Sequence, residues 1–212
     1  MAYLHGQRKR YVGPVSLFLI ANALFFATES LTGGRVFTTP LAAHLHTQPW
    51  SRVAERLVTH RLEVTQATRE AYAPVFDRAV GLNARSLIII MALSFAAALS
   101  IVFSGSGRPP VAHALFSLHF YAFLLLIFCV ATAVPPVNQW LGGGGFSSTR
   151  LDYAISIVLL VLSALYLNVA TGEVYGTAGA SRTLKVAALT AAVAAIVLGY
   201  RFVLFLVTLY TT

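Results

Sequence analysis

The sequence has 212 residues, of which 58% are apolar and only 10% are charged. Soluble globular domains carry about 25% charged residues, so this composition excludes an ordinary water-soluble domain and predicts a surface that faces lipid. The net charge is +8, but the basic residues are spread along the loops, where anionic lipid headgroups are their nearest partners. We therefore expect membrane lipids as partners and no nucleic acid.

Five apolar stretches are predicted to cross a membrane as helices, because a bilayer requires about 20 mostly apolar residues. They cover residues 12–29, 86–103, 111–134, 151–171 and 184–209. Pro14 fits the first turn of the first helix, and Pro135-Pro136 is expected to end the third. The length suits one compact helical bundle, so we expect a single membrane domain over residues 1–212.

The connection between the first and second spans is polar and long. Apolar residues recur in it at helical spacing, which predicts an amphipathic helix over about 49–72. Pro74 is expected to end this helix, because the residues before a proline are pushed out of helical geometry. Two environments suit such a helix: its own bundle, or the lipid interface.

These elements predict an all-α integral membrane protein with about five transmembrane helices and an amphipathic helix in the loop between spans one and two. Basic residues in short loops prefer the cytoplasm. With the N-terminus inside, the inner short segments hold Arg8, Lys9, Arg10, Arg108, Arg182 and Lys185, whereas the outer short loop holds Arg150. Seven arginines in the long polar loop argue the other way, but long segments translocate with less regard to charge. We expect a cytoplasmic N-terminus.

Polar residues at membrane depth are costly, so they usually pair or serve a function. Asn22 in the first span and His119 in the third lie roughly 12–15 Å from the same face, at a rise of 1.5 Å per residue. They are predicted to hydrogen-bond directly or through water. Glu29 and Arg201 also share a depth and are predicted to form an ion pair, although Arg201 could instead extend to the nearer interface.

The histidines give a weak signal for a cofactor. His113 and His119 are six residues apart, about 240° around a helix, so one helix cannot present both to a single metal or haem. His119 alone could be one axial ligand, but a hydrogen-bonded structural role is more common for a lone buried histidine. His44 and His46 would bind metal only if their segment were extended and other ligands converged. We predict no metal site and no cofactor.

Small residues form a stripe in the last span. Ala187, Ala191, Ala195 and Gly199 repeat every four residues, which predicts close packing by another helix. The sequence contains no G-x-S-x-G, Walker A, H-E-x-x-H or C-x-x-C motif. We therefore expect no enzymatic activity.

Three stretches carry a family resemblance: Gly6-Gln7-Arg8-Lys9-Arg10-Tyr11-Val12-Gly13-Pro14 leading into Leu17-Phe18-Leu19, Ala84-Arg85-Ser86-Leu87, and 113–124. They resemble a group of uncharacterised bacterial polytopic membrane proteins, known only as a domain of unknown function. The resemblance implies a multi-pass protein of the bacterial cytoplasmic membrane. Members of that group often carry an N-terminal zinc ribbon and a linker, and this sequence contains neither. The resemblance implies no reaction, substrate or cofactor.

Three functions are compatible with these features. The first is an accessory or scaffold subunit of a larger membrane complex, such as a respiratory or photosynthetic one. The small size, the small-residue stripe and the missing zinc ribbon favour it. The second is a protein that binds or transports a lipid-like molecule in a polar cavity near Asn22 and His119. The third is a membrane enzyme or haem-binding protein that uses His119.

Overall fold

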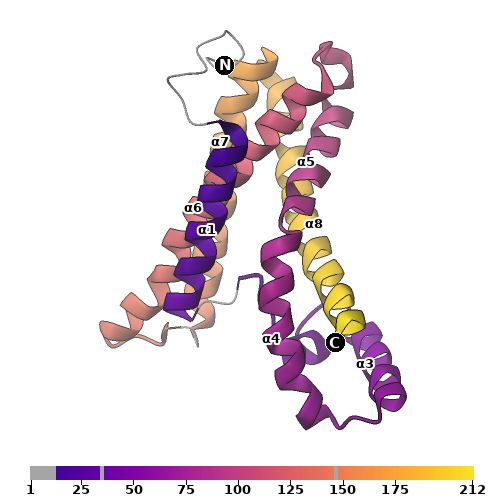
Figure 1. Ribbon diagram of the computed structural model, residues 1–212. Helices are drawn as coiled ribbons and strands as arrows, with labels where there is room; N and C mark the ends of the chain where they lie inside the picture. Colours follow the sequence, from indigo (N-terminus) through magenta and orange to yellow (C-terminus); the bar gives the residue numbers. More distant parts are fainter. Residues whose placement is uncertain (1–12, 34–35, 146–147) are drawn as a thin grey trace. The chain divides into compact units, whose positions relative to one another are not determined.

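The computed structural model describes residues 13–33, 36–145 and 148–212. These residues form helices, turns and loops, and no strand occurs among them. The α-helices shown in Figure 1 are α1 (Pro14–Thr32), α2 (Leu41–His46), α3 (Ser51–Thr65), α4 (Arg69–Leu87), α5 (Ile89–Val102), α6 (Pro110–Trp140), α7 (Thr149–Tyr175) and α8 (Gly179–Thr211). A 3-10 turn at Ser104–Ser106 lies between α5 and α6. The predicted all-helical class is confirmed for the described residues.

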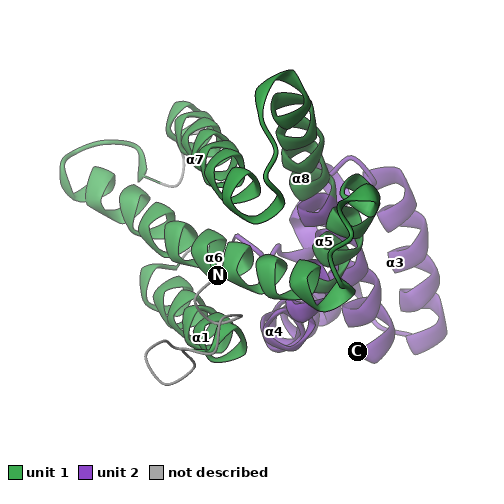
Figure 2. Cartoon of the chain, turned by 90° about the horizontal axis from the view of Figure 1, so that it is seen from above, with its two compact units in different colours: residues 1–34, 92–195 green, residues 35–91, 196–212 purple. Residues whose placement is uncertain are grey.

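The chain divides into two compact units, coloured separately in Figure 2. Unit 1 comprises residues 1–34 and 92–195, and unit 2 comprises residues 35–91 and 196–212. Unit 1 therefore contains α1, α6, α7, most of α5 and the first part of α8. Unit 2 contains α2, α3, α4 and the last part of α8. Whether both belong to a single membrane domain, as expected from the sequence, remains a prediction.

Four of the described helices, α1, α6, α7 and α8, are each long and apolar enough to cross a membrane. The helix α5 has 14 residues, fewer than the about 20 that a bilayer requires. A fifth span exists if α4 and α5, which are separated by a break at Ile88, form one broken span. The structure thus has four to five candidate spans. The predicted second span, 86–103, corresponds to α5 and the end of α4.

The third candidate span is longer than predicted. We expected Pro135-Pro136 to end it, but α6 continues through both prolines to Trp140. A proline removes its own N–H from the helix ladder, yet the residues after it can still bond backwards. Leu141 N, for example, lies 3.1 Å from Val137 O. The expectation of a stop at the proline pair was wrong, because two missing donors do not prevent the following turn from closing.

The amphipathic helix is shorter than predicted. Instead of covering about 49–72, it ends at Thr65, and Gln66 adopts a left-handed conformation with φ of 53°. The Thr68 side chain then accepts a hydrogen bond from a backbone N–H three residues on and so caps α4. Pro74 lies inside α4. A threonine cap, and not Pro74, therefore sets the boundary.

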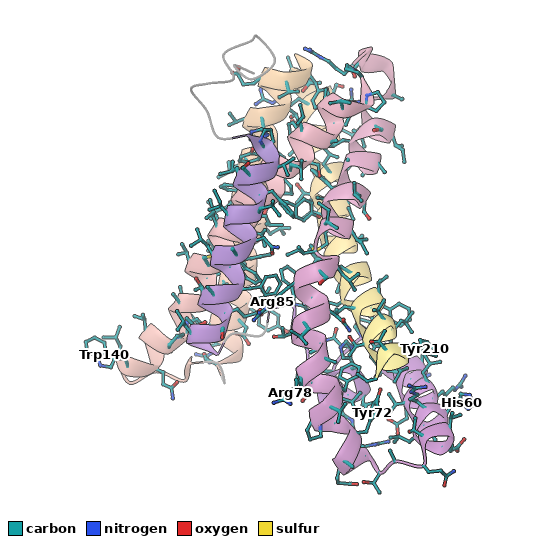
Figure 3. All side chains as sticks on the ribbon, in the orientation of Figure 1. His60, Tyr72, Arg78, Arg85, Trp140 and Tyr210 are labelled. Carbon is teal, nitrogen blue, oxygen red and sulfur yellow. The ribbon has the colours of Figure 1, made fainter. Side chains whose placement is uncertain are left out.

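The apolar side of α3 faces its own unit. Ala54 and Val58 are completely buried, whereas Arg52, Arg56 and His60 on the other side are exposed. Figure 3 shows His60 pointing away from the neighbouring helices of unit 2. We expected this helix to pack either on its own bundle or in the lipid interface. Ala54 and Val58 pack on their own unit.

In unit 2, α4 packs against the last part of α8, and polar contacts hold both ends of this pair. Near one end, the Tyr200 hydroxyl donates to Ala84 O over 2.7 Å. Near the other end, the Tyr72 hydroxyl lies 2.6 Å from Thr212 Oγ1. Since Ala84 lies in the last turn of α4 and Tyr72 lies in its first, the two helix segments run antiparallel. Phe76, between the two contacts, is fully buried.

In unit 1, α1 packs along α6, as Figures 1 and 2 both show. The rings of Phe25 and Phe128 meet with centroids 6.2 Å apart. On another side of α6, Phe123 stacks on Tyr166 of α7 with centroids 4.5 Å apart. Ser117 Oγ of α6 also donates a hydrogen bond to the backbone oxygen of Ala92, which belongs to α5 and is the first α5 residue of unit 1. The helix α6 is therefore central to unit 1 and contacts three others.

Candidate functional site

The predicted polar pair of α1 and α6 lies in unit 1. His119 Nδ1 is 2.8 Å from Leu115 O, one turn earlier on its own helix. Asn22 Oδ1 is buried and has no hydrogen-bond partner among the described residues. The structure records no hydrogen bond between the two side chains, and their pairing, direct or through water, remains a prediction. If His119 donates through Nδ1, its Nε2 atom remains free to accept a hydrogen bond or bind a haem iron.

The predicted ion pair joins residues of different units. Glu29 of unit 1 is buried, with 4% of its surface exposed. Arg201 of unit 2 donates through Nη2 to Val36 O over 2.8 Å. Arg201 thus has a backbone partner in its own unit, and its side chain is held inside that unit. The pairing of Glu29 with Arg201 is a prediction that these contacts do not test.

His44 forms a buried cluster in unit 2 that the sequence did not predict. Only 1% of its surface is exposed, and Trp50 Nε1 donates to its Nδ1 over 3.2 Å. The rings of Phe205 and Phe76 lie 4.8 Å and 6.0 Å from the imidazole, between centroids. Because Nδ1 accepts, the proton of the neutral ring is on Nε2.

Burial lowers the pKa of His44 to about 4, and the positive charge of Arg201 lowers it further, while a hydrogen bond with the Thr39 backbone acts in the opposite direction. The ring is therefore neutral near pH 7. It packs α2 against the neighbouring rings of Trp50, Phe76 and Phe205. His46, on the same short helix, is exposed. Among the described residues, no group of three or more His, Cys, Asp or Glu could hold a metal ion.

A second cluster lies in unit 1, where α5 and α7 end and α6 and α8 begin. The Tyr175 ring stacks on Phe103 with centroids 3.8 Å apart and planes 2° apart. Its hydroxyl lies 2.7 Å from His113 Nδ1. Lys185 Nζ lies 4.9 Å from the centroid of the Phe103 ring, a cation–π distance. These four residues and Arg108, whose charge acts on the Tyr175 hydroxyl, are called the Tyr175 cluster.

Two arginines bind backbone carbonyls near the C-terminal end of α7. Arg108 Nη2 donates to Val174 O over 3.0 Å, and Arg182 Nη2 donates to Asn168 O. Val174 O is among the last carbonyls of α7, which lack partners within the helix and carry partial negative charge, so the Arg108 cation is stabilising there. A Cβ atom at Gly172 would lie 2.9 Å from the Arg182 guanidinium, so a glycine gives this arginine room. The sequence placed these arginines in short loops but did not connect them to α7.

The small-residue stripe of α8 is exposed. Ala187, Ala191 and Ala195, which we call the alanine stripe, lie in unit 1 on the face opposite the buried Val186 and Leu189. Gly199, in unit 2, is also exposed, and a Cβ atom added to it would meet no heavy atom within 4 Å. The helix contact that this spacing predicts is therefore not made within either unit by the described residues.

The comparisons with known proteins concern only the start of the chain. A family model described as "Protein of unknown function (DUF3667)" matches residues 1–26, which end within α1. The match agrees with the resemblance to a family of unknown function but does not extend to residues 84–87 or 113–124. Residues 1–12 of the matched stretch lie outside the described part of the structure. Neither the curated proteins nor the solved structures give a match.

Acidification is expected to destabilise the protein through His44. The unfolded chain binds a proton at His44 near the ordinary pKa of 6.5, whereas the folded chain does so only near pH 4. The stability that depends on neutral His44 is therefore complete above about pH 6.5 and is lost as the pH falls towards 4. The measurement is the unfolding temperature in detergent between pH 7 and pH 4.5. Its dependence on pH should be shallower in His44→Phe than in the unaltered protein.

The exposed His60 provides the control for this titration. His60→Gln should leave the dependence of the unfolding temperature on pH unchanged, since the side chain has no buried environment to lose. Equal slopes for His44→Phe and the unaltered protein would show that His44 is not the group responsible.

Proposed function

We propose that the protein is a non-enzymatic, multi-pass subunit of a larger assembly in the bacterial cytoplasmic membrane. The observation that carries this proposal is the exposure of the alanine stripe of α8. Lipid tails are as apolar as leucine, so helices associate in membranes mainly through close packing, which small residues allow. A face of alanines on a candidate span, unused within its own unit, suits a helix of another subunit. Respiratory and photosynthetic complexes are hosts of this kind.

The use of the other polar groups supports a structural protein. His44, Tyr200 and Ser117 are each engaged by a neighbouring helix or loop of their own unit. Arg108 and Arg182 bind helix carbonyls. In each case the polar atom stabilises the packing of helices. An enzyme would instead hold several such groups towards a shared reacting atom.

A bulky residue in the alanine stripe should block assembly without unfolding the protein. Ala191→Leu adds three carbon atoms to an exposed position, so we expect an unchanged unfolding temperature and a loss of co-purifying subunits in mild detergent. Ala154→Leu makes the same change at an exposed position of α7 and should retain the partners. If Ala191→Leu keeps every partner that the unaltered protein has, the stripe is not the assembly surface.

The second candidate function is the binding or transport of a lipid-like molecule near Asn22 and His119. It is supported by Asn22 Oδ1 and the Tyr121 hydroxyl, which are among the buried polar atoms of unit 1 that have no hydrogen-bond partner in the described part of the chain. Buried polar groups in folded proteins are nearly always hydrogen-bonded, and each exception calls for a water, an ion or a ligand. A polar group on an otherwise apolar ligand would satisfy the Asn22 oxygen.

Replacing Asn22 tests this second candidate. Asn22→Leu should remove a small molecule that is bound when the protein is purified from its native membrane, as detected by native mass spectrometry. The matched control is Asn168→Leu, which alters an exposed amide on α7 and should leave the bound mass unchanged. A protein that carries no bound small molecule before the substitution would exclude this function.

We also propose that the N-terminus lies in the cytoplasm. In unit 1, α1 and α6 begin at the same end (Figure 1), and Arg108 lies two residues before the start of α6. Arg182 and Lys185 lie in the first turns of α8, and Lys185 lies over the Phe103 ring of the same cluster. Positive charge collected at one end of the spans favours the cytoplasm for that end.

Cysteine labelling tests this orientation. In a Cys129→Ala background, Ser106→Cys before α6 should react with a membrane-impermeant maleimide only when the cytoplasmic face is accessible, as in inverted vesicles. A cysteine at Thr212 should react from the opposite side if five spans are present. Labelling of Ser106→Cys in intact spheroplasts would show that this loop, and with it the N-terminus, lies outside the cytoplasm.

A further inference from the structure

The Tyr175 cluster contains cations that no carboxylate neutralises. Among the described residues, neither Arg108 nor Lys185 forms an ion pair, and the ion pair that the structure records, Arg69 with Glu55, belongs to unit 2. Glu173 is the one acid within residues 103–117 and 172–186, and its side chain is exposed. The cluster therefore has a net positive charge, which attracts an anion.

The cations are held at defined positions and keep free donors. Arg108 uses Nη2 for the Val174 carbonyl, while a guanidinium has five N–H donors in all. Lys185 lies over Phe103, whose ring is fixed by its stack with Tyr175. Tyr175 is itself fixed by its contact with His113. This ordering lowers the entropy cost of binding, because the side chains need not be immobilised by the ligand.

Apolar side chains are exposed on α7 and α8, the helices that carry Tyr175 and Lys185. Leu184 directly precedes Lys185 and has 73% of its surface exposed. Leu165 and Val169 are exposed on α7, within the last three turns before Tyr175. A ligand that carries both an anionic group and a hydrocarbon chain would thus find partners for both. Free phosphate would leave the apolar side chains uncovered.

We propose that Arg108 and Lys185 bind the phosphate of an anionic phospholipid, whose acyl chain lies along Leu165, Val169 and Leu184. This inference rests on the proposed membrane location, because the cluster then lies at the membrane–water interface. Aromatic residues gather at that level, and basic pockets between membrane helices bind anionic headgroups there. The site differs from the Asn22 region, since it recognises a headgroup at the interface.

The experiment compares the purified protein in nanodiscs and detergent with phosphatidylglycerol or with phosphatidylcholine. Native mass spectrometry should show retained phosphatidylglycerol in preference to phosphatidylcholine. Lys185→Gln and Arg108→Gln should each weaken this retention about fivefold, which is the contribution expected of one cation near an anionic headgroup. Lys185→Arg keeps the charge and should retain the lipid. Arg56→Gln, which alters an exposed arginine of α3, is the control and should have no effect.

Three results would overturn the lipid site. The first is equal retention of the two phospholipids. The second is unchanged selectivity in Lys185→Gln and Arg108→Gln when both variants keep the unfolding temperature of the unaltered protein. The third is displacement of the lipid by inorganic phosphate at millimolar concentration, which would assign the cations to a free anion. The loss of selectivity in Lys185→Arg as well as in Lys185→Gln would also count against recognition by charge.

This test is separate from the test of the membrane location. A protein that stays in the aqueous phase without detergent would exclude the membrane location itself. A protein that requires detergent but shows no preference for phosphatidylglycerol would exclude the lipid site alone. The alanine stripe shares a face of α8 with Leu184 but not with Lys185, and it is tested by its own variant, Ala191→Leu, which changes neither cation.

Discussion

Every backbone carbonyl needs a hydrogen-bond donor, and this chain has few polar side chains to supply one. This constraint determines most of the structure. Helices meet the need along their length, but each helix leaves its last carbonyls without partners. Side chains from other elements donate to several carbonyls: Arg108 and Tyr200 to Val174 and Ala84 in the last turns of α7 and α4, Arg182 to Asn168 inside α7, and Arg201 to Val36 in the connection between α1 and α2. The chain therefore places its scarce polar groups at helix ends and helix contacts. These polar groups stabilise the packing of the helices within each unit.

The groups that are not used in packing within a unit are the ones that bear on function. Among the described residues, three features stand out: the Asn22 oxygen, which has no hydrogen-bond partner there, the exposed alanine stripe, and the cations of the Tyr175 cluster, which form no ion pair there. They suit three kinds of partner, namely a polar ligand, a helix and an anionic headgroup. These partners are mutually compatible, because a subunit of the proposed kind would contact both protein and lipid.

The sequence predicted the long helices well and the contacts between them poorly. Long apolar runs leave few alternatives to a helix, so α1, α6, α7 and α8 were found from hydropathy alone. The boundary at Thr68 was missed because Pro74, a stronger local signal, lies inside α4. His113 and Tyr175 are 62 positions apart, and the sequence around either residue gives no signal that predicts their contact. The stripe of α8 could be recognised from its spacing, but whether that face is covered depends on the packing of the whole unit.

The unequal lengths of α1 and α6 have a consequence for the membrane location that we propose. With 19 residues, α1 is about 28 Å long, close to the thickness of a hydrocarbon core. The 31 residues of α6 make it about 46 Å long, and even a tilt of about 40° would leave it longer than that core. Because α1 packs along α6, it would limit how far α6 tilts in a membrane, and one end of α6 would then project. Trp140, 85% exposed at that end (Figure 3), is of the residue type that resides among headgroups. In the proposed membrane location, the polar last turns of α6, which hold Asn138 and Gln139, therefore lie among the headgroups, where Trp140 would anchor the helix.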